Sequence, residues 1–364
     1  MPSGKATCLC GAIDVSIPAG PPNKTELCHC NTCRQSTGAL FSGWIGPLDT
    51  TPSTEALEKC TIYRSSRTHD RYFCSTCGSK AFVHGHHYPN GSERGEWFIF
   101  GGSIDPPEDV DRVLDVTCHA YVSDAADGGM APFMTNLGGR DMPCFDQDEQ
   151  SSELSPTAMQ QLPQKSDISL PSSREGDLTA ECHCGSVSVR IQQANHEDTS
   201  ISQLERFIAK DKDGKATGKH MAFCCVCRSC RLHSGSSLTP WIYVPRSQVI
   251  NPQTGKIIAL HREAETDAGK AENKGLELLT YYWSSEDGCR SFCSVCGASV
   301  FYTYEHRQEI VNVAAGILRA EEGALARRWL SWQWGRTPWW KEGTTQRDVM
   351  EAWQATAAID SKLT

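Results

Sequence analysis

The stretch that decides the fold is Cys-His-Cys-Asn-Thr-Cys-Arg at residues 28–34, a Cys-x-Cys-x-x-Cys cluster near the start of the chain. The same spacing returns as Cys-Val-Cys-Arg-Ser-Cys-Arg at residues 225–231. Each cluster is bracketed by a Cys-x-Cys-Gly and a Cys-x-x-Cys-Gly motif, at residues 8–11 and 74–78 in the first copy and 182–185 and 293–297 in the second. Seven cysteines in one order, twice over, make 14 of the 19 in the chain. We therefore expect two copies of one cysteine-rich domain.

Matching residues outside the cysteines indicate a duplication. A glycine and a tryptophan follow each cluster at the same two distances, as Gly38, Trp44, Gly235 and Trp241. Both copies then read Arg-x-Phe-Cys-Ser-x-Cys-Gly across the downstream pair, at residues 71–78 and 290–297. Such agreement excludes chance similarity, so the two halves should share one fold.

Short alternating segments predict that this fold is mainly β. After each upstream cysteine pair, apolar and polar residues alternate with the period of a half-buried strand. The apolar positions are Ile13, Val15, Ile17, Val187, Val189 and Ile191. Further strand-like runs at residues 97–100 and 310–314 each lead into a turn of small residues.

Composition divides the chain into four parts. Residues 1–145 and 178–340 hold the two cysteine-rich copies, and each is predicted to be one zinc-bound domain. Residues 146–177 are rich in Ser, Gln, Pro and acids, which predicts a mostly irregular linker. Residues 341–364 form a tail with a predicted short amphipathic helix that packs back on the protein.

Two further segments belong to the second copy. Its end carries a tryptophan cluster that we interpret as a core or inter-domain seal rather than a ligand-stacking wall. These residues are Trp329, Trp332, Trp334, Trp339 and Trp340. An extra segment at residues 262–275, rich in Glu, Lys, Ala and Gly, is predicted to be a solvated surface excursion.

Charge and hydropathy exclude several classes of protein. The formal net charge of −9 argues against a nucleic-acid binder, which needs a basic face. The first residues lack an apolar signal region. The sequence also has no run of 18 apolar residues, so we predict no membrane partner. The sequence thus predicts a cytoplasmic protein, in which clustered thiols stay reduced and bind metal. No pattern indicates an oligomeric state.

The outer cysteine pairs predict a structural zinc site in each copy. Zinc takes four thiolates in a tetrahedron, and a Cys-x-x-Cys-Gly turn supplies two of them. The upstream Cys-x-Cys pair is the natural other half. The two predicted sites are Cys8, Cys10, Cys74 and Cys77 in the first copy, and Cys182, Cys184, Cys293 and Cys296 in the second.

The central clusters then keep three thiolates each. These are Cys28, Cys30 and Cys33, and Cys225, Cys227 and Cys230. Three protein ligands with one open position are typical of a catalytic zinc. Alternatively, a fourth protein ligand closes the site, for which the candidates are His29, His84, His86 and His87 in the first copy and Cys224 and His233 in the second.

The whole pattern resembles the glutathione-dependent formaldehyde-activating enzyme (GFA) family, which includes the centromere-protein-V-like proteins. The residues that carry the resemblance are the seven cysteines in order, Cys-His-Cys-x-x-Cys-Arg with a glycine five residues on, and Gly-Ser-Ile-Asp at residues 102–105. The resemblance covers both halves, and the tandem arrangement is similar to that of fungal members of the family. It implies a β-rich tent-like fold, a four-cysteine structural zinc, a second three-cysteine zinc and carbon–sulfur lyase activity with glutathione as co-substrate.

The second copy departs from this family pattern at three positions. Val226 replaces the histidine of the cluster, Ala298 replaces the serine after Cys-Gly, and Leu318 is aligned with Asp105. We therefore predict that the first half carries the chemistry.

The predicted catalytic residues are Cys28, Cys30 and Cys33 with their neighbours His29 and Arg34. His29 lies between two ligands and is expected to act beside the metal rather than on it. Arg34 is expected to offset the negative three-thiolate zinc or to pair a substrate carboxylate, or else to form a surface ion pair.

Two nearby residues have less specific roles. Asp105 is interpreted as capping a turn, with a proton shuttle as the alternative. His119 is interpreted as a core histidine.

Three functions follow from these features. The first is a zinc enzyme of the carbon–sulfur lyase type that acts on a thiol–aldehyde adduct or another small molecule. The second is a zinc-stabilised binding or scaffold protein. The third is a zinc lyase or hydrolase that tailors a metabolite without glutathione.

Overall fold

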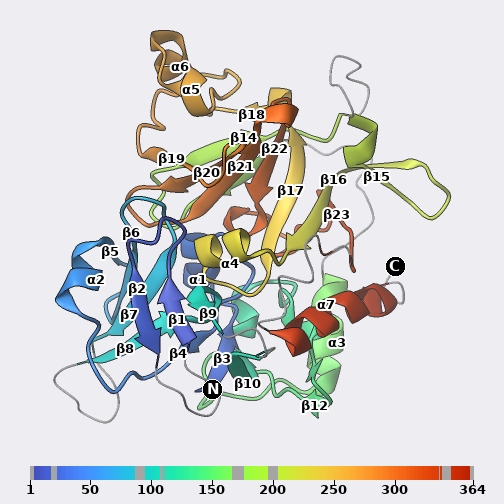
Figure 1. Ribbon diagram of the computed structural model, residues 1–364. Helices are drawn as coiled ribbons and strands as arrows, with labels where there is room; N and C mark the ends of the chain where they lie inside the picture. Colours follow the sequence, from blue (N-terminus) through green and yellow to red (C-terminus); the bar gives the residue numbers. More distant parts are fainter. Residues whose placement is uncertain are drawn as a thin grey trace.

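The first repeat is built around a five-stranded antiparallel sheet in the order β4-β8-β7-β6-β5 (Figure 1). This computed structural model describes residues 4–17, 23–86, 95–106, 110, 112–165, 176–195, 204–335, 337 and 346–360. A small sheet, β2-β1-β9, and a parallel pair, β10-β3, complete the repeat. The elements are β1 (Gly4–Thr7), β2 (Asp14–Ile17), β3 (Asn23–Cys28), α1 (Asn31–Thr37), β4 (Trp44–Ile45), α2 (Thr54–Glu58), β5 (Cys60–Arg64), β6 (His69–Cys74), β7 (Lys80–Gly85), β8 (Glu96–Phe100), η1 (Gly101–Ser103), β9 (Ile104–Asp105), β10 (Leu114–Ala120), η2 (Val122–Asp124), η3 (Ala131–Phe133), β11 (Asn136–Leu137) and β12 (Arg140–Asp141).

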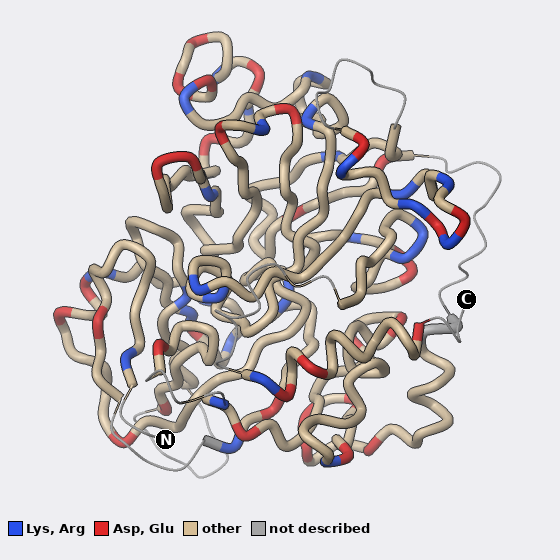
Figure 2. Tube along the Cα trace, turned by 45° about the vertical axis from the view of Figure 1, so that its right-hand side comes forward, with Lys and Arg blue, Asp and Glu red and all other residues tan. Residues whose placement is uncertain are grey.

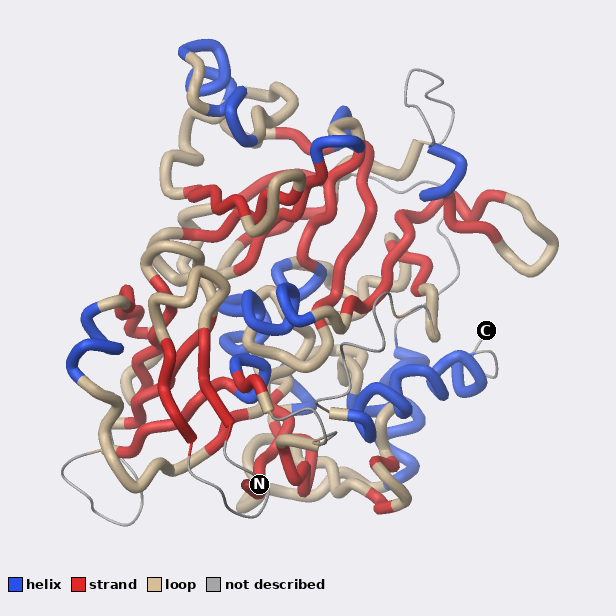
Figure 3. Tube along the Cα trace, viewed as in Figure 1, coloured by secondary structure: helices blue, strands red, loops and turns tan. Residues whose placement is uncertain are grey.

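The second repeat has the same plan. Its large sheet runs β15-β16-β17-β22-β21-β20-β19, its small sheet is β13-β14-β18, and β23 pairs with β16 in parallel. The elements are β13 (Leu178–Glu181), β14 (Ser188–Ile191), η4 (Leu204–Phe207), β15 (Ile208–Lys210), β16 (Ala216–Cys225), α4 (Arg228–Ser234), β17 (Thr239–Pro245), η5 (Arg246–Gln248), β18 (Val249–Ile250), α5 (His261–Ala264), α6 (Asp267–Glu272), β19 (Leu279–Trp283), β20 (Gly288–Cys293), β21 (Ser299–Tyr304), η6 (Glu305–Arg307), β22 (Ile310–Ala314), η7 (Ala315–Ile317) and β23 (Leu330–Trp332). The prediction of a mainly β fold with two tandem domains is confirmed (Figure 3).

Each cysteine cluster opens a short helix, and the sequence explains both ends of it. The Cys30 sulfur caps α1 by accepting from the Cys33 N–H at 3.2 Å. The helix ends at Gly38, whose φ of 82° is a left-handed conformation that favours glycine. Helix α4 repeats this arrangement with Cys227 and Gly235. Both helices lie near the centre of the molecule (Figure 1).

The two repeats interlock at these helices. The Gly316 N–H, in η7 of the second repeat, donates to the Gly38 carbonyl at 3.0 Å. Reciprocally, the Gly102 N–H, in η1 of the first repeat, donates to the Gly235 carbonyl at 3.0 Å. A Cβ on Gly102 would lie 2.3 Å from the Gly235 carbonyl carbon, so only glycine fits this approach. Each repeat therefore makes the same contact with the other, and the two are related by an approximate two-fold symmetry.

Aromatic residues extend this symmetry to the outer cysteine turns. Phe292 lies where a Cβ on Gly78 would be, and Phe73 lies where a Cβ on Gly297 would be. The two phenylalanine rings meet edge to face with centroids 6.2 Å apart. The outer cysteine site of each repeat is thus packed against the sheet of the other.

The carboxyl-terminal helix α7 (Arg347–Asp360) packs back on the protein, as predicted. Its Trp353 is buried and contacts Trp332 and Trp334, and Trp334 stacks on Phe133 of the first repeat. The tryptophan cluster is therefore an inter-repeat seal. Trp339 and Trp340, which the sequence analysis assigned to this cluster, lie outside the described residues.

Helical segments also occupy the predicted linker and the extra segment of the second copy. Helix α3 (Pro156–Lys165) lies within residues 146–177 and contacts η3. Helices α5 and α6 lie within or next to residues 262–275 and project from the second repeat (Figure 1). In the described part of the chain, no helix is long and apolar enough to cross a membrane.

Register in the small sheets corrects the alignment of Asp105. Ile104 lies opposite Ala6, whereas Leu318 lies opposite Ala180, and each alanine is two residues before the first cysteine of its repeat. Leu318 is therefore the counterpart of Ile104, and Arg319 takes the place of Asp105. The expected alignment was wrong by one residue because it matched Ile317 to Ile104, whereas the glycines that contact the other repeat, Gly102 and Gly316, are the true counterparts.

Candidate active site

The outer cysteines form two compact groups of four. In each group, all four sulfur atoms lie within 4.8 Å of one another. The sulfur of Cys10 is 3.5 Å from those of Cys8 and Cys74, and the sulfur of Cys184 is 3.5 Å from Cys182 and 3.6 Å from Cys293. A tetrahedral zinc with Zn–S bonds of about 2.3 Å needs sulfurs about 3.8 Å apart, so these donor sets fit zinc.

The central cysteines form two groups of three. Cys28, Cys30 and Cys33 make one, with 3.4 Å between the sulfurs of Cys33 and Cys28. Cys225, Cys227 and Cys230 make the other. Among the described residues, no further Cys, His, Asp or Glu atom joins either group within 4.8 Å. Each group thus offers three thiolates for zinc and, within the described structure, no fourth protein ligand.

The candidate fourth ligands are engaged elsewhere. Asp70, His84 and His86 form a group of their own, with His86 Nε2 at 2.7 Å from the Asp70 carboxylate. His233 Nδ1 pairs with the Ser299 hydroxyl at 2.8 Å. Cys224 belongs to the apolar core rather than to the cluster, and His87 lies outside the described residues.

An arginine that the sequence did not single out contacts each three-cysteine group. Arg71 Nη2 donates to the Cys33 sulfur at 3.2 Å, and Arg290 Nη2 donates to the Cys230 sulfur at 3.4 Å. Both are buried and begin the shared Arg-x-Phe-Cys motif. That shared motif was the available signal, because an arginine present in both copies close to a metal ligand is well suited to donate a hydrogen bond to a thiolate.

This arrangement selects which thiol of the first cluster ionises most readily. Hydrogen bonding with Cys28 and Cys30, and after it the charge of the Arg71 guanidinium, holds the pKa of Cys33 well below its usual range. Hydrogen bonding to Cys30 and Cys33, together with burial, raises the pKa of Cys28 well above it. The arginine therefore favours the thiolate form of the sulfur that it contacts.

Arg34 occupies the interface between the repeats. Its Nη1 donates to the Gly316 carbonyl at 3.3 Å and its Nη2 to the Asn31 side chain at 2.8 Å. Its counterpart Arg231 donates to the Gly102 carbonyl at 2.7 Å. In both repeats the arginine after the last ligand thus joins one half to the other.

His29 is fully buried next to the first cluster. Its Nε2 lies 2.9 Å from His119 Nδ1, and His119 Nε2 lies 2.9 Å from the Met134 carbonyl. Because a carbonyl only accepts, this chain of bonds assigns the His119 proton to Nε2 and the His29 proton to Nε2. Burial and the neighbouring His119 lower the pKa of His29 well below its usual range. The pair therefore positions the cysteine segment as a neutral unit.

Asp105 reaches into the second repeat rather than toward the first cluster. Its carboxylate accepts from Arg228 Nε at 2.8 Å and from Arg231 Nη2 at 2.7 Å. Neither a turn cap nor a proton shuttle describes this residue, which forms an ion pair between the repeats.

A cavity of about 780 Å³ opens onto the first three-cysteine cluster. Cys28, Cys30 and Cys33 all line it, with Trp44, Arg71 and His69. Its other polar walls come from β3, from the end of β10 and from the loop at residues 147–150. The half-buried Glu26 is part of this lining, and burial followed by the charges of Cys33, Glu149 and Asp148 raises its pKa to about 7.

Bulky side chains fill the equivalent space over the second cluster. Phe223 stands where the first repeat has Glu26, and Tyr243 stands where it has Gly46. The rings of Phe223 and Tyr243 stack with centroids 4.7 Å apart in one apolar cluster with Cys225 and Cys230. The second cluster is therefore sealed by aromatic packing on the side where the first is open.

Two more side chains, one aromatic and one basic, complete this seal. Tyr302 lies opposite Arg290 in the sheet, where Val83 lies opposite Arg71. Arg307 covers the Tyr243 ring at 5.0 Å from its centroid. These groups reinforce the barrier over the second cluster.

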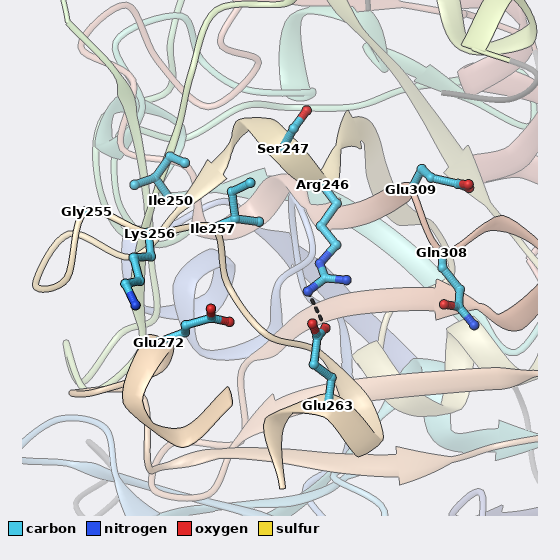
Figure 4. Close-up of a pocket in the computed structure, with 10 residues that line it drawn as sticks. All are labelled: Arg246, Ser247, Ile250, Gly255, Lys256, Ile257, Glu263, Glu272, Gln308 and Glu309. Carbon is cyan, nitrogen blue, oxygen red and sulfur yellow. Dashed lines mark hydrogen bonds and ion pairs between the residues drawn. The ribbon is translucent and has the colours of Figure 1, made fainter. Parts of the chain in front are cut away.

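A second concavity, of about 770 Å³, lies at the end of the second repeat that carries α5 and α6 (Figure 4). Its lining contains no cysteine, and Arg246 pairs with Glu263 across it (Figure 4). Along the part of the chain that the structure describes, Lys and Arg positions are interspersed with Asp and Glu (Figure 2). Of these two cavities, the one over the first cluster is lined by the three cysteines of a candidate metal site.

Comparison with known proteins agrees with this architecture. The family model of the glutathione-dependent formaldehyde-activating enzyme matches residues 3–123 and again residues 213–332. The chain therefore belongs to this family, with two tandem copies of its domain. An uncharacterized lyase of Schizosaccharomyces pombe is 33% identical over 82 residues, which are 22% of this chain and 58% of that relative. The match thus spans little more than half of the relative. No solved structure matches the chain.

Proposed function

We propose that this protein is a zinc-dependent lyase that joins a thiol and an aldehyde reversibly in the cavity of the first repeat. The observation that carries the proposal is the contrast between the two clusters. The same three cysteines and the same arginine occur twice, but a cavity opens onto Cys28, Cys30 and Cys33, whereas aromatic side chains pack against the second cluster. Membership of the family and a relative named a lyase support the reaction class.

The reaction balances without an oxidant or reductant. The C–S bond forms as the thiol sulfur adds to the carbonyl carbon, the C=O π bond breaks, and the sulfur proton ends on the carbonyl oxygen. When bound by the three cysteines, zinc supplies a Lewis acid that lowers the pKa of a thiol or polarises a carbonyl group. Cys28, Cys30 and Cys33 would supply three ligands to this zinc, which would leave a coordination position for a substrate.

The chain's own residues supply the surroundings for this step. Arg71, itself part of the cavity lining, donates to the Cys33 sulfur, and Trp44 forms an apolar wall of the cavity. Glu26 is the half-buried carboxyl group of the lining, and we assign to its side chain the transfer of the proton from sulfur to oxygen. His29 and His119 position the cysteine segment from the other side.

Paired substitutions in the two clusters test the proposal. Cys30→Ala should abolish turnover of thiol and aldehyde while leaving the fold, because it removes one ligand of the open site. Cys227→Ala makes the same change in the sealed cluster and should only reduce turnover by loosening the second repeat.

Circular dichroism first establishes that both variants fold, and a panel of thiols and aldehydes then measures turnover. An inactive Cys227→Ala beside an active Cys30→Ala would assign the chemistry to the second repeat. Full activity in both variants would exclude the open-zinc reaction and favour a zinc-stabilised scaffold.

A further inference from the structure

The cavity over the first cluster has an acidic mouth. Asp124, Asp148 and Glu149 line it, and all three are exposed. Lys24 and Arg71 are the lysine and arginine of the lining. Arg71 is buried and donates to the Cys33 sulfur, so it balances the cluster rather than the mouth. The exposed charged residues of the lining are therefore three carboxylates and one lysine.

The metal centre would not reverse this negative charge. Three thiolates around a divalent zinc leave one net negative charge, which a buried guanidinium offsets. The cavity as a whole keeps an excess of carboxylates even when Glu26 is neutral. A cleft lined by one sign of charge concentrates ligands of the opposite sign and repels ligands of its own.

The acidic residues are held in place by the surrounding backbone. The loop at residues 147–150 is tied to the end of β10, because the Tyr121 N–H donates to the Gln147 carbonyl at 2.6 Å. Within the loop, the Asp148 carboxylate accepts from the Gln150 N–H at 3.0 Å. On the opposite side, the Asp124 carboxylate accepts from the Asn31 N–H at the start of α1, also at 3.0 Å. The charge of the mouth is thus part of a fixed frame around the cysteines.

We infer that this cavity selects thiols that carry a positive charge and disfavours anionic thiols such as glutathione. The inference rests on the proposed function for the identity of the reacting group. The site itself is the cavity on the three cysteines, and the carboxylates set which substrates enter it. The cation would face Asp124, Asp148 and Glu149 while its sulfur reaches the cluster.

Thiols matched in shape but not in charge test this selection. Thiocholine is cationic, 3,3-dimethylbutane-1-thiol is its neutral isostere, and 3-mercaptopropionate and glutathione are anionic. Calorimetric titration into the zinc-loaded full-length protein measures each dissociation constant, and turnover with formaldehyde is followed in parallel. At low ionic strength thiocholine should bind about tenfold tighter than its isostere, and the ratio should shrink in 0.5 M salt, roughly the regime of a Debye length under 5 Å.

A variant with a neutralised loop provides a second test of the charge preference. Asp148→Asn with Glu149→Gln should reduce the preference for thiocholine several-fold, since it removes two of the three carboxylates. Asp213→Asn with Glu265→Gln makes the same change in net charge at exposed sites of the second repeat outside this cavity, and should leave the preference unchanged. Zinc content is measured for every sample.

The outcomes separate the two proposals. Equal or tighter binding of 3-mercaptopropionate or glutathione, or an unchanged preference in the Asp148/Glu149 variant, would overturn the inference. Charge-ordered binding without turnover of any thiol would keep the inference and remove the lyase function. Turnover of all four thiols with no dependence on charge would keep the lyase function and remove the inference.

Discussion

Arg71 and Arg290 are equivalent residues with different surroundings, which makes them a matched pair for testing the three-cysteine centres. Each donates to the last thiolate of its cluster. Arg71→Gln should weaken zinc binding at the first cluster about 10–100-fold, the usual effect of removing a residue that supports a ligand, and should lower turnover with it. Arg290→Gln should weaken zinc at the second cluster without a comparable loss of turnover.

Competition with a chromophoric chelator measures zinc retention in both variants. Equal losses of turnover in Arg71→Gln and Arg290→Gln would contradict the assignment of chemistry to the first repeat. A fold check by circular dichroism accompanies both variants because both arginines are buried.

Lys80 predicts a pH-dependent stability. It is buried in β7, and its Nζ donates to the Gly78 carbonyl at 2.9 Å and to the His233 carbonyl at 3.0 Å. Burial lowers the pKa of Lys80 from 10.5 to about 7. Between these two values the unfolded chain binds more protons than the folded one, so stability should rise as the pH rises from about 7 toward 10. Below pH 7 the lysine is protonated in both states and contributes no slope.

The comparison with Lys80→Met isolates this contribution, because methionine does not titrate. Urea denaturation of both proteins at pH 6, 7, 8 and 9 should show the difference in unfolding free energy moving in favour of the wild type above pH 7. A difference that stays flat over this range would show that Lys80 keeps an ordinary pKa in the folded protein.

At the scale of single residues, the sequence was sufficient for the ligands but not for their neighbours. The spacing of the fourteen cysteines predicted both kinds of donor set. The position of Arg34 next to Cys33 suggested a contact, yet on a helix consecutive residues point in different directions, and Arg34 turns to the other repeat. Arg71 reaches Cys33 from a strand 38 residues away, a proximity set by the pairing of whole sheets.

Among the elements, the turns η1 and η7 decide how the repeats fit together. Gly316→Ala should be strongly destabilising, because the added Cβ would lie 2.1 Å from the Ala39 carbonyl oxygen and the helix cannot retreat without breaking its bond to Gly316. Gly102→Ala meets the Gly235 backbone in the same way. We expect each to lower the free energy of unfolding by about 3 kcal/mol, at the upper end of overpacking in a close-packed interior.

Gly214→Ala is the control for this pair. Gly214 has a φ of 77°, but an added Cβ would meet nothing within 4 Å, so the cost should stay at about 1 kcal/mol for the left-handed conformation. Chemical denaturation measures all three variants. Losses in Gly102→Ala and Gly316→Ala no larger than in Gly214→Ala would mean that the close approach of the repeats is not needed for stability.

The elements themselves were largely predictable, whereas their contacts were not. Alternation marked β2 and β14, and the cysteine motif with its following glycine marked α1 and α4. The filling of the second cavity depends on Phe223 and Tyr243 meeting across β16 and β17, a register that local patterns do not specify. The one-residue error at Leu318 had the same origin, since only pairing with β13 fixes that position.

At the scale of the whole molecule, the two repeats are expected to unfold together. The backbone bonds of Gly38 with Gly316 and of Gly102 with Gly235 cross between the halves. The buried Asp127 of the first repeat also accepts from the N–H groups of Ala324 and Leu325 at 2.9 Å each. These contacts link the predicted domains at residues 1–145 and 178–340, whose exact boundaries stay predictions.

Metal removal tests this coupling. Four cysteine groups predict about four zinc ions per chain, and zinc in the outer groups contributes to folding because it joins distant strands. Cys77→Ser in the first repeat and Cys296→Ser in the second should each remove one ion and lower the melting temperature of a single transition that includes both repeats. Cys60→Ser is the matched control, since Cys60 is half-buried and belongs to none of the metal-binding groups of the described structure.

Elemental analysis and thermal unfolding measure the two effects. Two separate transitions, one of them unaffected by the substitution, would show that the halves fold independently. Fewer than two zinc ions in the unmodified protein would contradict the assignment of the four metal-binding groups, because the four-cysteine groups alone should retain two.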